Sequence, residues 1–110
     1  MVNVRGGGRS GTSRLCLRGE RPTIEVEGPV DALNAPYVEA LVDRGRGGNC
    51  RVVDIDLRHV PLVAAAGLSV FARCAAHVRL LNPSPLTVKV LDLTGLTAVL
   101  HIARSPDVPA

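Results

Sequence analysis

Two aspartates, Asp54 and Asp56, are the residues whose spacing is best suited to chemistry. They alternate with apolar residues in a segment that reads Val-Asp-Ile-Asp-Leu over residues 53–57, and a period of two places both carboxylates on one face of a strand. A carboxylate pair can supply a general acid and a general base. No nucleophile, base and orienting group can be assembled around the pair, so we expect no enzymatic activity. Pairing of Asp54 with an arginine is the favoured interpretation.

Histidines and cysteines are the other candidates for chemistry, and neither set has the spacing of a metal site. The three histidines are too scattered for two to share a helix face, and the three cysteines form no CxxC motif. They are His59, His77, His101, Cys16, Cys50 and Cys74. We therefore expect no metal and no cofactor. An odd number of cysteines without a secretory signal predicts a reducing, cytoplasmic setting, and a redox role for Cys74 is a hypothesis that rests on its position alone.

The basic character of the chain is confined to one end. The formal net charge of the chain is +3. The first 21 residues contain five arginines and one glutamate, and the remainder of the chain is slightly acidic. No basic face with interleaved aromatic residues is left to bind nucleic acid. No apolar run approaches the ~20 residues that span a bilayer, so we expect no membrane insertion. With 46% hydrophobic residues but one Phe, one Tyr and no Trp, the 110 residues predict one domain with an aliphatic core.

Alternating and helical periodicities outline the elements that must hold these side chains. Alternation predicts strands at 14–18, 23–27, 51–57 and 77–81. Asn34 is a candidate cap for a helix that runs to about Asp43, a second helix follows the alanines at 64–66, and Ser84 with Pro85 begins a third. Residues 98–102 fit either a last strand or a short helix. Residues 1–13 are rich in Gly, Arg and Ser and predict a flexible leader.

The order strand, strand, helix, strand, helix, strand, helix resembles the STAS family, whose best-known members are the bacterial anti-sigma factor antagonists. The resemblance covers residues 14–102 and leaves 103–110 as a C-terminal tail. Three local matches carry it: Glu-Gly-Pro-Val-Asp at 27–31, Asp-Leu at 56–57 with the hydrophobic loop up to Gly-Leu at 67–68, and the segment 81–96. The resemblance implies an α/β fold with a small mixed sheet of four to five strands and helices mainly on one face.

The loop before the second helix departs from the family pattern. The family reads Asp-Ser-Ser/Thr-Gly where this chain reads Ala64-Ala65-Ala66-Gly67, so the resemblance places the phosphate acceptor at Ala65. Alanine has no hydroxyl and cannot take a phosphate. Between Gly67 and the fourth strand the chain is also shorter than usual, which predicts a short helix.

The resemblance implies a noncatalytic module that binds a kinase-type anti-sigma factor and so regulates transcription. Its expected contact rim consists of Asp31, Asn34, Ala64, Ala65, Ala66, Gly67 and Leu68. Two alternatives stay open: a STAS subunit that docks on the ATPase of a lipid-transport ABC system, and a sensor of a small ligand or nucleotide. The alanine loop at 64–67 is compatible with a protein that binds its partner constitutively or with one that has lost partner binding.

Overall fold

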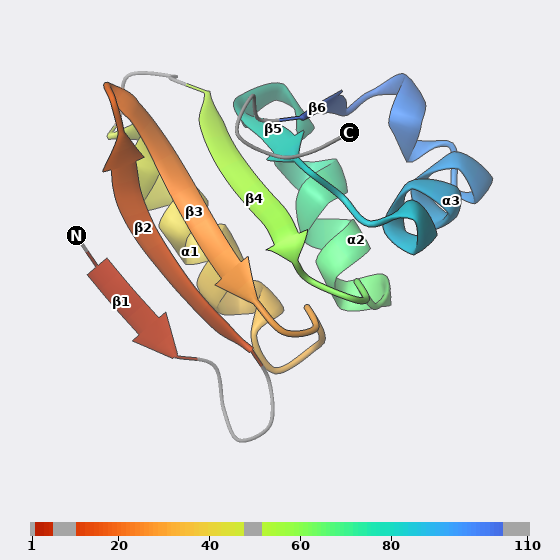
Figure 1. Ribbon diagram of the computed structural model, residues 1–110, viewed down its shortest axis with the longest axis horizontal. Coiled ribbons are helices and arrows are strands. Elements are labelled where there is room, and N and C mark those ends of the chain that lie inside the picture. The colour runs from red at the N-terminus through yellow and green to blue at the C-terminus, as the bar shows by residue number, and fades with distance from the viewer. Residues whose placement is uncertain (1, 6–10, 48–51, 105–110) are drawn as a thin grey trace.

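A computed structural model describes the backbone of residues 2–5 and, with side chains, residues 11–47 and 52–104. One mixed sheet carries six strands in the order β1-β2-β3-β4-β5-β6 (Figure 1). The strands are β1 Val2–Arg5, β2 Thr12–Arg18, β3 Arg21–Glu27, β4 Val53–His59, β5 Val78–Leu81 and β6 His101–Ala103. The helices are α1 Ala35–Arg46, α2 Ala65–Arg73 and α3 Pro85–Leu93, with 3₁₀ turns η1 Ala75–His77 and η2 Leu96–Ala98.

The sheet combines two antiparallel pairings with three parallel ones. β1 and β3 each run antiparallel to β2, whereas β3, β4, β5 and β6 run parallel to one another. The predicted α/β class with a mixed sheet is confirmed, and β2 to β6 are the five strands of the predicted domain. β1 adds a sixth within the residues that composition predicted to be a flexible leader. Composition could not indicate this strand because it exists through pairing with β2.

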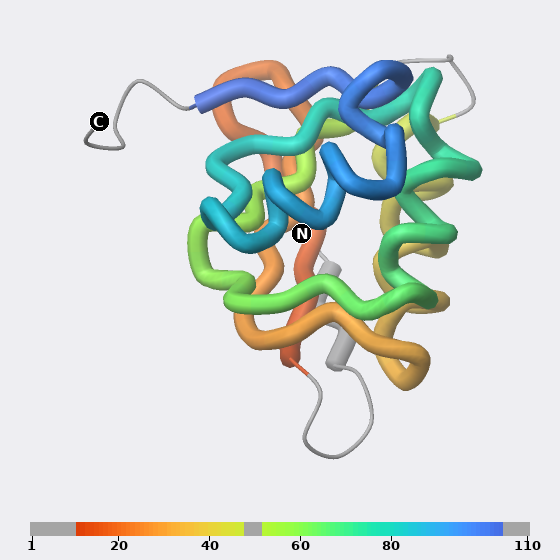
Figure 2. Tube along the Cα trace, turned by 90° about the vertical axis from the view of Figure 1, so that its right-hand side faces the viewer, coloured from red at the N-terminus to blue at the C-terminus, as the bar shows by residue number. Residues whose placement is uncertain are grey.

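The helices α1 and α2 lie on the same face of the sheet (Figure 2). Alternation within each strand directs apolar side chains toward them, including Ile24 and Val26 of β3 and Ile55 of β4, all at most 2% exposed. Phe71 of α2 is fully buried in the same cluster. Because burial of apolar surface is the main force that holds such layers together, this aliphatic core fixes the positions at which α1 and α2 begin.

Helix α1 is longer than predicted. It continues past Asp43 to Arg46 and ends at Gly47, whose φ of 57° lies in the left-handed region that favours glycine. Gly45 does not end the helix but lets it approach β4, since a Cβ there would lie 2.9 Å from Cγ2 of Val53. The helix therefore extends to Arg46, past the predicted apolar stripe to about Asp43, and Gly45 serves packing within it.

In the C-terminal third of the chain, the structure shows how α3 begins and which elements residues 98–102 form. Ser84 caps α3 as predicted, because its Oγ accepts the Thr87 backbone N–H at 3.1 Å. Of residues 98–102, Ala98 ends η2, residues 99 and 100 form a turn, and residues 101 and 102 belong to β6, which pairs with β5 in the register Arg79 to His101. The predicted short helix is confirmed by α2, which has 9 residues and is followed after Cys74 by η1 and β5.

Candidate functional site: the rim and the opposite sheet face

The predicted rim lies where β3 and β4 end and where α1 and α2 begin, at the lower edge of Figure 1. Val30 joins the two sides through its backbone. Its N–H donates to the carbonyl of Leu62 at 3.0 Å, and its carbonyl accepts the N–H of Ala64 at 2.7 Å. Segments more than 30 residues apart in the chain therefore form a single edge.

A buried asparagine holds the first side of this edge. The Oδ1 of Asn34 accepts the N–H of Asp31 at 2.8 Å, and its Nδ2 donates to the carbonyl of Pro29 at 2.8 Å. The Asp31 carboxylate in turn accepts the N–H of Leu33 at 2.9 Å. Asn34 is 0% exposed and makes no side-chain cap bond to α1. Asn34 therefore stands at the N-cap position, as predicted, but its amide shapes the turn that precedes the helix instead of capping the helix.

The second side of the edge is the alanine turn. Ala64 has the extended conformation of an N-cap, with φ −79° and ψ 173°, but contributes no side-chain cap bond to α2. Ala65 is exposed, while Ala64, Ala66 and Leu68 are half-buried and Gly67 is buried. The structure thus brings the seven predicted rim residues together, but Asn34 and Gly67 shape the rim from within rather than presenting a side chain. A role in partner contact stays a prediction for all seven.

Three exposed apolar residues lie near the starts of α1 and α2 and are not among the seven residues of the predicted rim. Leu33, Leu62 and Tyr37 expose 61%, 47% and 39% of their surface, respectively. Two runs without any charged residue, at 32–38 and 60–72, carry all three. These runs are a signal that could have identified them, because surface loops ordinarily carry charge. Apart from Asp31, the rim is therefore an uncharged, partly apolar edge.

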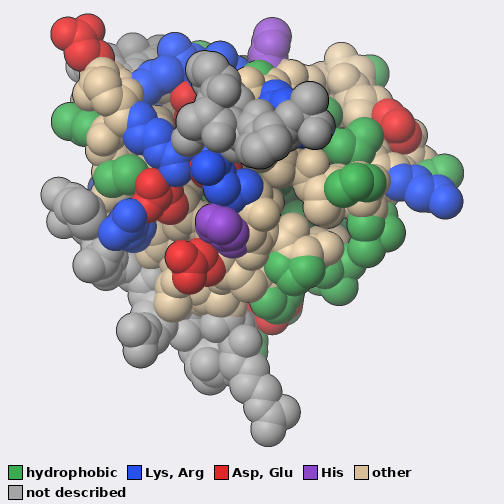
Figure 3. Space-filling model, viewed as in Figure 1, with side chains coloured by type: hydrophobic (Ala, Val, Ile, Leu, Met, Phe, Trp, Pro, Cys, Tyr) green, Lys and Arg blue, Asp and Glu red, His purple; other side chains and the backbone are tan. Residues whose placement is uncertain are grey.

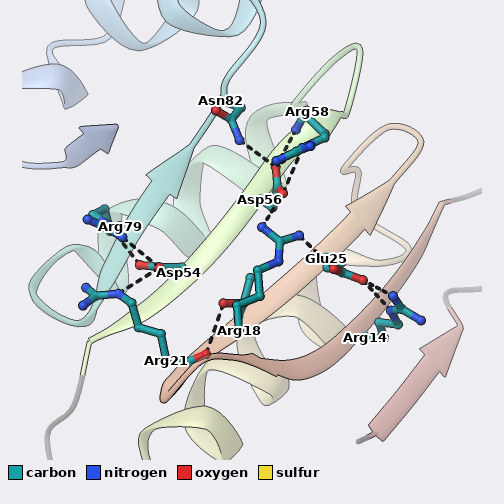
Figure 4. A network of polar contacts seen from close by, with 10 residues as sticks. Arg14, Arg18, Arg21, Glu25, Asp54, Asp56, Arg58, Arg79 and Asn82 are labelled. Carbon is teal, nitrogen blue, oxygen red and sulfur yellow. Dashed lines mark hydrogen bonds and ion pairs between the residues drawn. The ribbon is translucent and has the colours of Figure 1, made fainter. Parts of the chain in front are cut away.

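The two aspartates lie on the opposite, helix-free face of the sheet, where arginines surround them (Figure 4). Asp54 accepts two hydrogen bonds from Arg79, from Nε at 3.0 Å and Nη2 at 2.9 Å, and a third from Nε of Arg21 at 2.9 Å. The predicted pairing of Asp54 with an arginine is confirmed. Each of these bonds joins a neighbouring strand to β4, so they link strands across the sheet.

Asp56 is held by a similar set of donors. Its carboxylate contacts Arg18 Nη1 at 2.7 Å, Arg58 Nε at 3.1 Å and Asn82 Nδ2 at 3.2 Å. Burial alone would raise the pKa of Asp56, but hydrogen bonds from the Arg58 backbone N–H, Arg18 and Asn82 outweigh it and hold the pKa below its ordinary value. A carboxylate stabilised in its charged form is a poor proton donor or acceptor near neutrality. This favours a structural role for Asp56 over acid–base catalysis.

Neither thiol that the structure describes is activated. Burial raises the pKa of both Cys74 and Cys16, which reduces the thiolate fraction that redox chemistry requires. Cys50 lies outside the described residues. Within the described ranges, no three His, Cys, Asp or Glu side chains are grouped to hold a metal ion. None of the helices in those ranges has both the length and the apolar character that crossing a membrane requires.

Solved structures share this architecture at low sequence identity. An anti-sigma factor antagonist from Mycobacterium paratuberculosis superposes with a TM-score of 0.76 at 21% identity, covering 89% of each chain. An anti-sigma-factor antagonist (STAS) domain protein from Planctomyces limnophilus gives 0.69 at 18% identity, covering 84% of this chain and 90% of that one. The Bacillus cell fate determinant SpoIIAA, in its phosphorylated form, gives 0.64 at 17% identity, covering 86% and 92%. At such identities the likeness shows a shared fold.

The family assignment comes from the sequence itself. No curated protein matches the chain as a close relative. The model of the STAS domain family, however, matches residues 18–107, which include every strand from β3 onward and all three helices. The chain belongs to the STAS domain family.

Proposed function

We propose that this chain is a noncatalytic, cytoplasmic module that acts as an anti-sigma factor antagonist, regulating transcription by binding a kinase-type anti-sigma factor through the rim. The observation that carries the proposal is the position of Ala65. It is the first residue of α2, is exposed, and stands where the family resemblance places the phosphate acceptor. Similar structures described as anti-sigma factor antagonists support the same assignment.

The surface chemistry of the rim supports protein binding. Leu33, Tyr37 and Leu62 present apolar area near the starts of α1 and α2, and the backbone bonds of Val30 hold the two sides in a fixed relation. Interfaces concentrate binding energy in a few apolar or aromatic side chains on a pre-organised surface. The rim has these properties without any charged residue at 32–38 or 60–72.

The alanine at position 65 implies constitutive binding. Phosphorylation adds about −1.5 to −2 charge and three acceptor oxygens to a hydroxyl residue. Ala65 offers no hydroxyl for this change, so a kinase has no means of releasing the partner at this position. We therefore expect binding that does not respond to ATP.

A pull-down from the cytoplasm of the source cell, with identification by mass spectrometry, tests the proposal. Leu62→Asp places a charge in the rim, whereas Leu93→Asp makes the same change at the most exposed leucine of α3, which is 78% exposed. We expect an anti-sigma factor to be captured by the wild type and by Leu93→Asp but not by Leu62→Asp. Capture of a transporter ATPase would favour the transport alternative, and equal loss with both variants would contradict a contact role for the rim.

The captured kinase then allows a test of the lost switch. Ala65→Ser restores a hydroxyl at the exposed start of α2. With ATP, we expect phosphate to be incorporated into Ala65→Ser but not into the wild type, and the modified protein to release its partner. Failure of the kinase to modify Ala65→Ser would count against a partner surface retained around this position.

A further inference from the structure

The outer side of α3 carries an apolar stripe. Leu86, Val90 and Leu93 stand at positions i, i+4 and i+7, so they lie along one side of the helix. Leu86 and Leu93 are 52% and 78% exposed, and Val90 is half-buried. Figure 3 shows hydrophobic side chains gathered over the part of the molecule where Figure 1 labels α3. A row of exposed apolar residues, unlike a single one, is typical of an interaction surface.

The fold of the chain does not use this stripe. Helix α3 packs on the core through other residues, Thr87 and Leu91, which are both buried. Leu93, in contrast, is the most exposed large hydrophobic residue in the described part of the chain. The two outer leucines therefore gain little from folding, and a contact outside the chain accounts for them better.

Two charged residues flank the stripe. Lys89 and Asp92 are exposed and follow Leu86 by three and six residues, which places both along the same flank of the helix. Within residues 11–47 and 52–104, neither of them is held in an ion pair. The flank thus presents one positive and one negative charge, in that order along α3.

This order of residues matches an antiparallel copy of the same helix. Val90 lies near the middle of the stripe, with Leu86 four residues before it and Leu93 three residues after it. A two-fold axis near Val90 would place Leu86 opposite Leu93 of a second copy, and Lys89 opposite Asp92 of that copy. A parallel pair would instead place Lys89 beside Lys89, and like charges repel.

We infer that the outer side of α3 is a contact surface for a second copy of this chain, packed antiparallel about a two-fold axis near Val90. Charge complementarity within one helix selects this occupant. An anionic lipid surface is disfavoured because it attracts helices with a basic polar face, and α3 carries one basic and one acidic residue. A helix of 9 residues buries little area, so we expect a weak dimer with a dissociation constant on the order of 100 µM.

Sedimentation of the full chain over protein concentrations from about 10 µM to about 1 mM tests the inference. The mean mass of the wild type should rise from 11.6 kDa toward twice that value. Leu93→Asp should stay a monomer throughout, since it places a charge in the apolar stripe. Leu17→Asp makes the same change at a leucine of β2 that is 69% exposed, and it should dimerise like the wild type.

Charge reversal tests the antiparallel register. Lys89→Asp and Asp92→Lys each replace attraction by repulsion, so each variant alone should have a dissociation constant about ten-fold higher than the wild type. A chain with both reversals restores opposite charges at each meeting point and should return to within about three-fold of the wild type. Far-UV circular dichroism of each variant verifies that it is folded.

Three results would overturn the inference. They are a wild type that remains monomeric at the highest concentration, equal weakening of the dimer by Leu93→Asp and Leu17→Asp, and a double reversal as weak as the single ones. Helix α3 contributes no residue to the rim, and Leu93→Asp is expected to retain partner capture. Failure of the dimer and failure of the rim as a partner surface are therefore distinguishable.

Discussion

A Cβ atom on Gly67 would lie 2.7 Å from Cγ1 of Val30, closer than real Cβ contacts allow. It would also lie 2.7 Å from Cγ1 of Val63. The absent side chain lets the first turn of α2 rest against the edge of the sheet. Both sides of the rim therefore depend on a glycine at this position.

Gly67→Ala is expected to destabilise the protein by about 1 to 3 kcal/mol, because a methyl group must displace Val30 or Val63 in a well-packed region. Urea unfolding followed by circular dichroism measures the change. Ser69→Ala, at an exposed position of the same helix, is the control and should alter the free energy of unfolding by less than about 0.5 kcal/mol. Equal stability of Gly67→Ala and wild type would mean that the rim can relax around the added methyl.

The uncapped start of α2 offers a stabilising substitution. Ala64 already has the backbone conformation of an N-cap but provides no acceptor. Ala64→Asp should raise the free energy of unfolding by about 1 kcal/mol, since its carboxylate can accept an N–H of the first turn and favours the positive end of the helix.

Helix α3 allows the opposite experiment, in which an existing side-chain cap is removed. Ser84→Ala removes a cap bond that is present and should lower the free energy of unfolding by about 1 kcal/mol. Thermal or urea unfolding of Ala64→Asp and Ser84→Ala measures both expected changes. A loss of stability in Ala64→Asp would show that the turn before α2 cannot accept a side-chain cap.

The buried aspartates should be essential for stability. Asp54→Ala leaves Arg21 and Arg79 facing each other without their carboxylate, and we expect a loss of about 2 kcal/mol, below the full cost of breaking a buried pair because both arginines are partly exposed. Glu39→Gln breaks the surface pair with Arg73 that joins α1 to α2 and should have little effect. Comparable losses in the two variants would contradict the difference in burial.

Acid should weaken the fold through Asp56 and Glu25. Hydrogen bonds from Arg18 and Arg14 lower the pKa of Glu25, and the pKa of Asp56 is also lowered. A carboxyl with a lower pKa in the folded state contributes stability above the unfolded-state pKa of about 4 and loses it as pH falls through the folded-state pKa. The free energy of unfolding should therefore decline below about pH 4.

Asp56→Asn isolates one of these two groups. Urea unfolding at a series of pH values between neutrality and about 2 should show a shallower decline for Asp56→Asn than for the wild type, because one titrating group has been removed. An unchanged slope would mean that Asp56 does not contribute to the acid response.

The sequence by itself determined the order of elements and the class of fold. Alternation at 23–27 and 53–57 and the Ser84-Pro85 signal identified local structure correctly, because side-chain period and capping are properties of neighbouring residues. The loss of a hydroxyl at position 65 could likewise be read directly from the chain.

Tertiary structure decided what neighbouring residues cannot encode. Pairing with β2 created β1, and pairing with β5 settled the state of residues 101–103. Asn34 was a candidate cap by type, but its burial and its bonds to Asp31 and Pro29 made it a support of the turn.

The rim and the helix-free face of the sheet illustrate the same difference between what the sequence shows and what the fold determines. The uncharged runs and the alternating aspartates are visible in the sequence, but the rim exists because Val30 binds the loop before α2. Likewise, Arg21 and Arg79 meet at Asp54 because β3, β4 and β5 bring these three residues together across 58 residues of chain. Contacts between distant segments depend on the register of the sheet and the packing of its helices, and only the folded chain determines both.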